Sequence, residues 1–372
     1  MNNLNKRNSL VDIMKGICII LMVAGHANFP LTKFIYLFHM PVFFMLSGYC
    51  YKTNYSDSLI LVVSFIKKRG TTLWIPFVIW TSIFTILHNV FINFNIYTDN
   101  PLFITWDLKQ DNSQLLYPIN IFNVIKSIGK SILLSGSTQI GCGLWFLAIL
   151  MKISLLYCFI EYFLKKIAPN KIMILQILIS FLLLVIGFAC HVNGISLLSI
   201  DKVFSYYILY NLGYTIKAID LGRIIEKGKV PRILLSLVSL GFLILSKKIG
   251  YIALDRTDYK HPLFLITVCL LGWVFIYEIS YLITKNDVMS KVLVFIGQNT
   301  LGILILHLLS FKIVTLLGIL LYDYPIYTLA SFPILFDNGI WWIIYTTIGV
   351  IIPLSLSIGY RKFIEIANLG IR

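Results

Sequence analysis

Two histidines near the start of the chain, His26 and His39, have the residue type and the spacing for proton transfer. Each lies at the edge of an apolar stretch. If these two stretches form an antiparallel hairpin that turns near residues 32–33, both imidazoles fall at the same depth. Histidine titrates closest to neutral pH, so such a pair suits general acid–base catalysis. His26 and His39 are therefore candidate catalytic residues.

Asp12 and Lys15 precede His26 in the first apolar stretch and share one helical stripe with it. Lys15 and His26 are 11 residues apart, which at roughly 100° per residue is about 20° past three full turns. Ionisable groups within apolar spans rarely face lipid, so the stripe is predicted to face the bundle interior or a wet cavity. A second interpretation stays open: Asp12 and Lys15 pair at the membrane interface, and His26 caps the helix near the outer headgroups.

Three consecutive cations, Lys67, Lys68 and Arg69, stand directly before the third apolar stretch. Clustered cations at the mouth of a bundle attract phosphate groups, so the cluster is a candidate site for a phosphate-bearing cofactor. The alternative is that the three side chains only anchor a helix at the cytoplasmic interface.

Ser47, Asn299 and His307 are further candidates. Ser47 stands beside Gly48, where a packing or backbone-bonding role is the more common one for serine. His307 lies about 12 Å into its apolar stretch if a helix begins near Asn299. It is then either a functional mid-membrane histidine or one that is hydrogen-bonded to a neighbouring helix. The sequence contains no metal-ligand cluster, Walker loop, GxSxG elbow or dinucleotide fingerprint, so no metal cofactor is expected and an ATP-driven pump with its own nucleotide domain is excluded.

The elements that must position these side chains are apolar stretches of membrane-spanning length. Of the 372 residues, 58% are hydrophobic and only 13% are charged, which excludes an ordinary cytosolic enzyme. Spans of about 17–25 residues are predicted at 10–27, 34–51, 71–93, 143–163, 171–190, 203–219, 231–249, 262–284, 299–321 and 339–360. We predict an all-α, polytopic membrane helix bundle over residues 9–360, with about ten transmembrane helices and no separate soluble domain.

The distribution of Lys and Arg gives the predicted helices a direction. With the N-terminus inside, nineteen of these residues fall in cytoplasmic segments and nine in outer segments, as the positive-inside rule requires. Both ends of the chain are therefore predicted to be cytoplasmic. Because the net charge of +15 reflects this topology, no nucleic-acid partner is expected. In the longest interruption, residues 94–142, the stretch 121–134 is amphipathic and is predicted to lie along the membrane surface.

Taken together, the motifs resemble membrane acyltransferase family 3, and within it most closely the fucose 4-O-acetylase-like sugar O-acetyltransferases. The similarity begins with DIMKGI from Asp12, GH ending at His26, and FHMPVFFMLSGY from Phe38 to Tyr49. It continues with LWIP ending at Pro76, LWFL from Leu144, GQNTLG from Gly297, and His307. The resemblance thus extends from about residue 9 to residue 360.

The resemblance implies a multi-pass protein of the bacterial plasma membrane with about ten helices. It also implies transfer of an acyl group, usually acetyl from cytoplasmic acetyl-CoA, to a hydroxyl of a cell-surface polysaccharide or its lipid-linked precursor. In the family the residue eleven positions before the first-span histidine is usually Arg, and here it is Lys15. The second Arg of the family's R-x-x-R element is replaced by Thr72, so Lys67 and Lys68 would add charge beside Arg69 without the bidentate geometry of Arg.

The mechanism expected from this resemblance uses acetyl-CoA as the donor, with its phosphates held by Lys67, Lys68 and Arg69. His26 would act as the general base on a sugar hydroxyl or as a transient acyl carrier. His39 would assist, and Asp12 would orient Lys15.

The expected partners of the protein are a sugar acceptor and membrane lipids. Two other interpretations stay open. One is a transporter or flippase for a glycolipid or small solute, with the polar stripe as its path. The other is a scaffold within a glycan-assembly complex, in which the stripe is structural.

Overall fold

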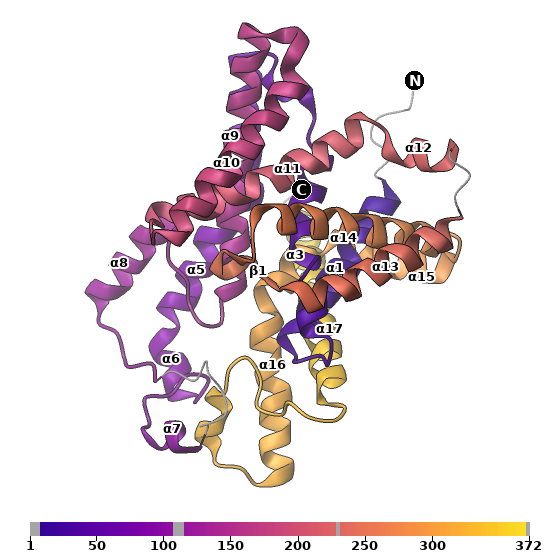
Figure 1. The fold of residues 1–372 in the computed structure, drawn as a ribbon. Coiled ribbons are helices and arrows are strands. Elements are labelled where there is room, and N and C mark those ends of the chain that lie inside the picture. Colours follow the sequence, from indigo (N-terminus) through magenta and orange to yellow (C-terminus); the bar gives the residue numbers. More distant parts are fainter. Residues whose placement is uncertain (1–7, 107–114, 228–230, 370–372) are drawn as a thin grey trace. The chain divides into compact units, whose positions relative to one another are not determined.

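The computed structural model describes residues 8–106, 115–227 and 231–369, and most of them are helical (Figure 1). The predicted all-α class is therefore confirmed. Within the described part of the chain, the only sheet is a hairpin of two short strands, β1 (Ile252–Ala253) and β2 (Asp258–Tyr259).

The chain forms two compact units. The first unit comprises Met1–Cys18, Lys33–Phe77 and Trp145–Gln298, and the second comprises Ile19–Thr32, Val78–Leu144 and Asn299–Arg372. Three helices contribute residues to both units, α1 (Ser9–His26), α2 (Thr32–Ile35) and α5 (Ile75–Ile86).

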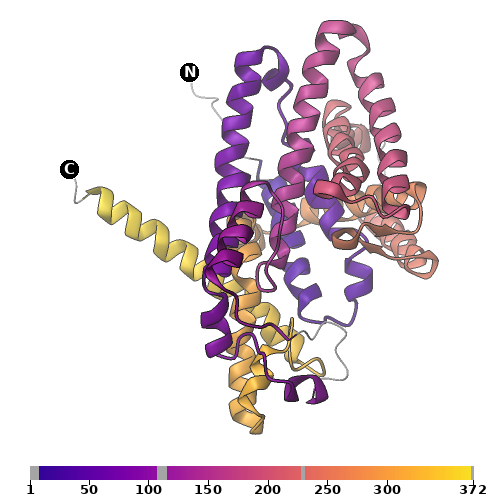
Figure 2. The same cartoon turned by 90° about the vertical axis from the view of Figure 1, so that its left-hand side faces the viewer.

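The first unit contains most of the described helices. They are α2 (Thr32–Ile35), α3 (His39–Tyr49), η1 (Thr53–Ser56), α4 (Leu59–Arg69), η2 (Gly70–Trp74), α9 (Trp145–Ile167), η4 (Pro169–Lys171), α10 (Ile172–Val192), η5 (Leu197–Ser199), α11 (Ile200–Ala218), α12 (Leu221–Lys227), α13 (Arg232–Ile249), η6 (Leu254–Arg256), α14 (Pro262–Ile283) and α15 (Asp287–Gln298). Helices α9 and α10 lie side by side in both views (Figures 1 and 2).

Small residues let α3 and α11 approach each other closely inside the first unit. A Cβ atom added at Gly48 would lie 1.8 Å from the carbonyl oxygen of Tyr210, and one added at Gly213 would lie 1.8 Å from that of Met45. Both distances are far below a van der Waals contact, so neither position tolerates a side chain. Gly48 and Gly213 therefore allow the close packing of α3 and α11.

The second unit is centred on the pair α16 (Thr300–Tyr322) and α17 (Trp341–Leu369), which pack against each other (Figures 1 and 2). Its shorter elements are α6 (His88–Asn93), α7 (Leu102–Trp106), α8 (Ile121–Ile132), η3 (Cys142–Leu144) and η7 (Ile326–Ala330). Helix α8 covers the predicted amphipathic stretch, and Ile121, Phe122 and Ile125 on it are exposed.

Six helices in the described part of the chain are long and apolar enough to cross a membrane, so the predicted count of ten and the predicted topology are not confirmed. They are Ser9–His26, Cys142–Ile167, Pro169–Val192, Pro262–Ile283, Thr300–Tyr322 and Trp341–Gly359.

Breaks in the helices explain two of the differences. The predicted span 34–51 is divided into α2 and the 11-residue α3, which is about 16 Å long against a hydrocarbon thickness of about 30 Å. The predicted span 71–93 is divided into the π-helical turn η2 and the helices α5 and α6.

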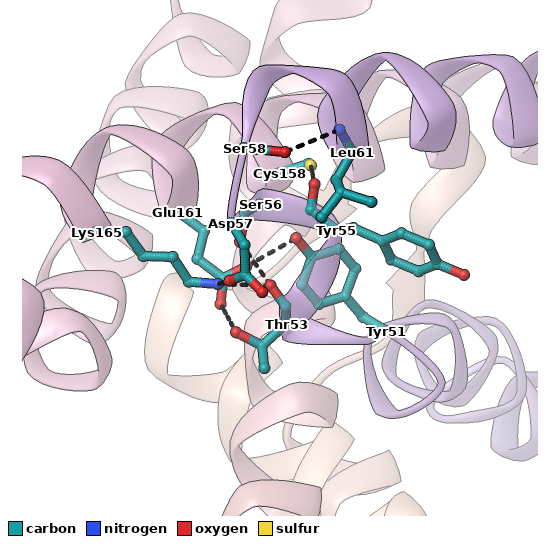
Figure 3. A network of polar contacts seen from close by, with 10 residues as sticks. All are labelled: Tyr51, Thr53, Tyr55, Ser56, Asp57, Ser58, Leu61, Cys158, Glu161 and Lys165. Carbon is teal, nitrogen blue, oxygen red and sulfur yellow. Dashed lines mark hydrogen bonds and ion pairs between the residues drawn. The ribbon is translucent and has the colours of Figure 1, made fainter.

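A buried carboxylate in the first unit connects α9 to the segment that follows α3 (Figure 3). Glu161 is fully buried, and its oxygens accept hydrogen bonds from the hydroxyls of Tyr51 at 2.7 Å, Ser56 at 2.5 Å and Thr53 at 3.1 Å. A buried charge is costly unless it is hydrogen-bonded in this way. Glu161 therefore holds the turn η1 in a fixed position before α4, the helix that ends at Arg69.

Replacement of Glu161 by Ala should destabilise the protein strongly, because it removes the acceptor of the buried Tyr51 and Ser56 hydroxyls and of the exposed Thr53 hydroxyl. We expect a loss of about 3 kcal/mol, measured as a lower unfolding temperature of the purified protein in detergent. Asp57→Ala is the matched control. It removes a carboxylate that is 54% exposed and pairs with Lys165 at 2.6 Å, so it should cost less than about 1 kcal/mol. Equal shifts in the two variants would contradict a structural role for the Glu161 network.

Candidate active site

Two imidazoles come together in the second unit. His26 is the last residue of α1, and His307 lies in α16. Their ring centroids are 5.3 Å apart and the rings are inclined by 37°. His307 is fully buried, whereas His26 is partly exposed. Of the histidines singled out in the sequence, these two therefore form a pair in one unit.

Backbone carbonyls determine the tautomer of His307. Its Nδ1 lies 3.0 Å from the carbonyl oxygen of Ile303 and 3.1 Å from that of Leu304. A carbonyl only accepts hydrogen bonds, so Nδ1 is assigned as the protonated nitrogen and Nε2 of the neutral ring carries the lone pair. Nε2 is buried and has no hydrogen-bond partner among the described residues. His307 thus holds a proton-accepting nitrogen inside the unit.

The depth of His307 agrees with the sequence prediction. Helix α16 begins at Thr300, and Asn299 is its N-cap residue. The predicted distance of about 12 Å along the helix to His307 was counted from this helix start. Asn299 is itself buried, at 5% exposure.

A glycine lies against the buried imidazole. A Cβ atom added at Gly143, in η3, would lie 3.7 Å from Cε1 of His307 and 3.4 Å from a side-chain atom of Leu304. A methyl group at Gly143 would thus be in ordinary van der Waals contact with the His307 ring.

In the first unit, Asp12 is buried and held from two sides. Its Oδ1 lies 3.5 Å from Nζ of Lys15, and its Oδ2 accepts a hydrogen bond from the amide of Gln298 at 3.3 Å. The ion pair is the predicted i, i+3 pair. Helix α1 is unbroken from Ser9 to His26, so the helical spacing that the predicted stripe requires is present.

The three predicted cofactor-binding cations do not share one environment. Nη2 of Arg69 donates hydrogen bonds to Ser47 Oγ and to the Tyr210 hydroxyl, each at 3.3 Å, and the guanidinium carbon lies 5.1 Å from the ring centroid of Phe65. Lys67 and Lys68 are exposed. Arg69 therefore extends toward residues of α3 and α11, and the π-helical turn η2 follows it directly, a feature that is frequent at functional sites.

His39 lies in the first unit and is 4% exposed. Its Nδ1 is 2.9 Å from the carbonyl oxygen of Ile35, and its ring centroid is 5.2 Å from that of Tyr36. Because His39 and His26 belong to different units, their predicted pairing at one depth stays a prediction.

Sequence reasoning missed Tyr210, Gln298 and the contact of Gly143 with His307. Tyr210 is one of 21 tyrosines, and nothing in its flanking residues distinguishes it from the others. Gln298 stands inside one of the motifs that carry the family resemblance and Gly143 directly precedes another, but the sequence does not reveal their contacts. Among the described residues, no group of three or more His, Cys, Asp or Glu side chains could hold a metal ion.

Comparison with known proteins relates the chain to acyltransferases. A family model described as an acyltransferase domain matches residues 8–358. The chain is also similar to the nodulation protein NolL of Sinorhizobium fredii (strain NBRC 101917 / NGR234), with 37% identity over 95 residues that cover 21% of this chain and 25% of NolL. That match thus spans a quarter of the length of the relative. No solved structure matches the chain.

The assigned tautomer of His307 predicts an order of stability between two amide replacements. His307→Asn puts an NH₂ group near the position of Nδ1 and keeps a donor for the carbonyls of Ile303 and Leu304. His307→Gln puts its amide near the position of Nε2 and loses that donor. We expect the Asn variant to be more stable by about 1 kcal/mol in thermal unfolding of the purified protein. A Gln variant at least as stable as the Asn variant would show that the tautomer is assigned wrongly.

Proposed function

The chain belongs to acyltransferase family 3, and from that premise we propose that it is an O-acyltransferase of the bacterial plasma membrane. It moves an acyl group, acetyl in the first instance, from cytoplasmic acyl-CoA to a hydroxyl of a cell-surface polysaccharide or its lipid-linked precursor. The observation that carries the proposal is the contact of His26 with His307 in the second unit. A pair of imidazoles, one of them a neutral ring with a buried lone pair, suits the proton transfers of ester formation.

In the proposed reaction His26 is the general base, because it is the partly exposed member of the pair. It takes the proton of the sugar hydroxyl as the hydroxyl oxygen bonds to the acyl carbon. The bond from that carbon to the sulfur of CoA breaks, and the proton passes to the leaving thiolate. The products are the sugar ester and CoA-SH. His307 is the positioning residue that supports the His26 ring, by the logic in which one group orients the base.

Residues of the first unit are proposed to hold the donor. Arg69 supplies a planar guanidinium for a phosphate group, and Lys67 and Lys68 add exposed positive charge. Asp12 orients Lys15 through their ion pair. The helical rise from Lys15 to His26 is about 16 Å, a distance that an extended pantetheine arm covers. His39, Ser47 and Asn299 are further candidates, with His39 assisting proton transfer.

His26→Ala should lower acyl transfer by about 10²–10⁴-fold, because a general base contributes that much to a rate. His307→Asn should lower kcat while keeping the KM values. O-acetyl content of the surface polysaccharide, measured by mass spectrometry in cells that carry each variant, reports acyl transfer, and initial rates of the purified variants give kcat and KM. The control is His88→Asn, since His88 also lies in the second unit but contacts the carbonyl of Tyr117. Normal acetylation by the His26→Ala protein at wild-type expression would exclude the proposed base.

Arg69→Lys keeps the positive charge but loses the planar fork, so the KM for acetyl-CoA should rise about tenfold with a smaller change in kcat. Lys171→Arg, also a charge-conserving exchange at an exposed position, should leave both constants unchanged. Initial rates of the purified protein at varied acetyl-CoA concentration provide the test. If the wild-type protein does not bind acetyl-CoA, the transporter interpretation gains, because a flippase has no need of this donor.

A further inference from the structure

A polar cavity lies in the first unit, away from every residue assigned above. It has a volume of about 370 Å³ and is lined by His191 at the end of α10, by Ser199, Asp201 and Lys202 around the start of α11, and by Arg256 and Thr257 next to the β hairpin. This volume is within the range of small-molecule binding sites. In the topology predicted from the distribution of Lys and Arg, Lys202 and Arg256 lie in outer segments.

Asp201 gives the cavity an acceptor that protein atoms leave unused. The residue is 3% exposed, and its Oδ2 accepts a hydrogen bond from the Thr257 hydroxyl at 2.7 Å. Its Oδ1 is buried and accepts no hydrogen bond from any residue that the structure describes. An unsatisfied carboxylate oxygen in a cavity wall is suited to receive a donor from a ligand, since leaving it unpaired is costly.

The wall around Asp201 is fixed by side chains of α11. The hydroxyl of Tyr206 donates to the carbonyl oxygen of Leu254 at 2.6 Å, and that of Tyr259 donates to Ser205 Oγ at 2.7 Å. Lys202 Nζ donates to the carbonyl oxygen of Asp255 at 2.5 Å. These contacts connect the hairpin to the first turns of α11, so the cavity is preorganised for binding.

The charges around the cavity restrict the ligand. Lys202 and Arg256 line it, and His191 Nδ1 lies 4.0 Å from Asp201 Oδ2. Two cations beside the carboxylate disfavour a bare metal cation, and the open carboxylate oxygen disfavours a phosphate or sulfate. A saccharide fits both, because its hydroxyls donate to a carboxylate and accept from Lys and Arg.

We propose that this cavity binds a saccharide unit of the acceptor glycan, with one sugar hydroxyl donating a hydrogen bond to Asp201 Oδ1. The assignment to the acceptor rests on the proposed function. The binding of a sugar does not, because it follows from the cavity alone. Asp201 is here a binding residue, and no step of acyl transfer is assigned to it.

Sugar binding by the full-length protein in lipid nanodiscs tests the proposal. D-glucose, D-galactose and D-glucuronate are titrated in saturation-transfer NMR without any acyl donor. We expect binding of at least one neutral sugar, weakened about tenfold by Asp201→Asn, because the charge-assisted hydrogen bond is lost. The matched control, Asp287→Asn, makes the same chemical change at an exposed carboxylate of the first unit that does not line the cavity, and it should bind as the wild type does.

A second variant keeps the test decisive if Asp201→Asn does not fold. His191→Gln changes a partly exposed cavity residue and should also weaken binding. No binding of any of the three sugars by the wild type would overturn the inference, as would unchanged affinity in both variants. Sugar binding without acetyl transfer would overturn the proposed function and leave the cavity assignment intact. If acyl transfer occurs but neither variant changes the KM for the acceptor, the cavity assignment is wrong and the proposed function stands.

Discussion

An ionisable side chain inside an apolar helix bundle has to meet hydrogen-bond partners, and this requirement governs how both units are built. Lys312, in the middle of α16, is 4% exposed and donates to the carbonyl oxygens of Leu329 and Ser331 at 2.9 and 2.8 Å. The carboxylate of Glu161 accepts hydrogen bonds from three hydroxyls. Such groups are costly without partners. Non-helical segments supply these partners: residues 50–58 contain the donors to Glu161, and residues 326–335 contain the acceptors for Lys312.

The same constraint separates structural ionisable groups from candidate functional ones. Neighbouring protein atoms form hydrogen bonds or ion pairs with Glu161, Lys312 and Asp12. His307 is satisfied at Nδ1 only, with its other nitrogen buried, and Asp201 is satisfied at one oxygen only. A polar atom that protein groups leave unpaired is available for proton transfer or for a ligand. The two positions define a candidate catalytic pair in the second unit and a candidate sugar cavity in the first.

Local patterns in the sequence predict part of the fold and part of the candidate site. The sequence predicted the helix start near Asn299, the i, i+3 pair of Asp12 and Lys15, and the all-α class. Contacts between distant segments could not be predicted in this way. Hydropathy did not reveal the breaks that shorten α3, and nothing in the sequence connected His26 to His307, which are 281 positions apart. Arg69 was predicted to bind a phosphate at the mouth of the bundle or to anchor a helix, and its hydrogen bonds to Ser47 and Tyr210 could not be predicted from the sequence.

Isotope transfer tests the central claim most directly. The purified protein is reconstituted in vesicles with acetyl-CoA labelled in the acetyl group and with the surface polysaccharide, or its lipid-linked precursor, from a host strain that lacks this protein. The account predicts that the label appears in the glycan as a base-labile ester, with release of one CoA-SH for each acetyl group transferred. Label that stays in acetyl-CoA while the glycan moves unmodified across the membrane would contradict it.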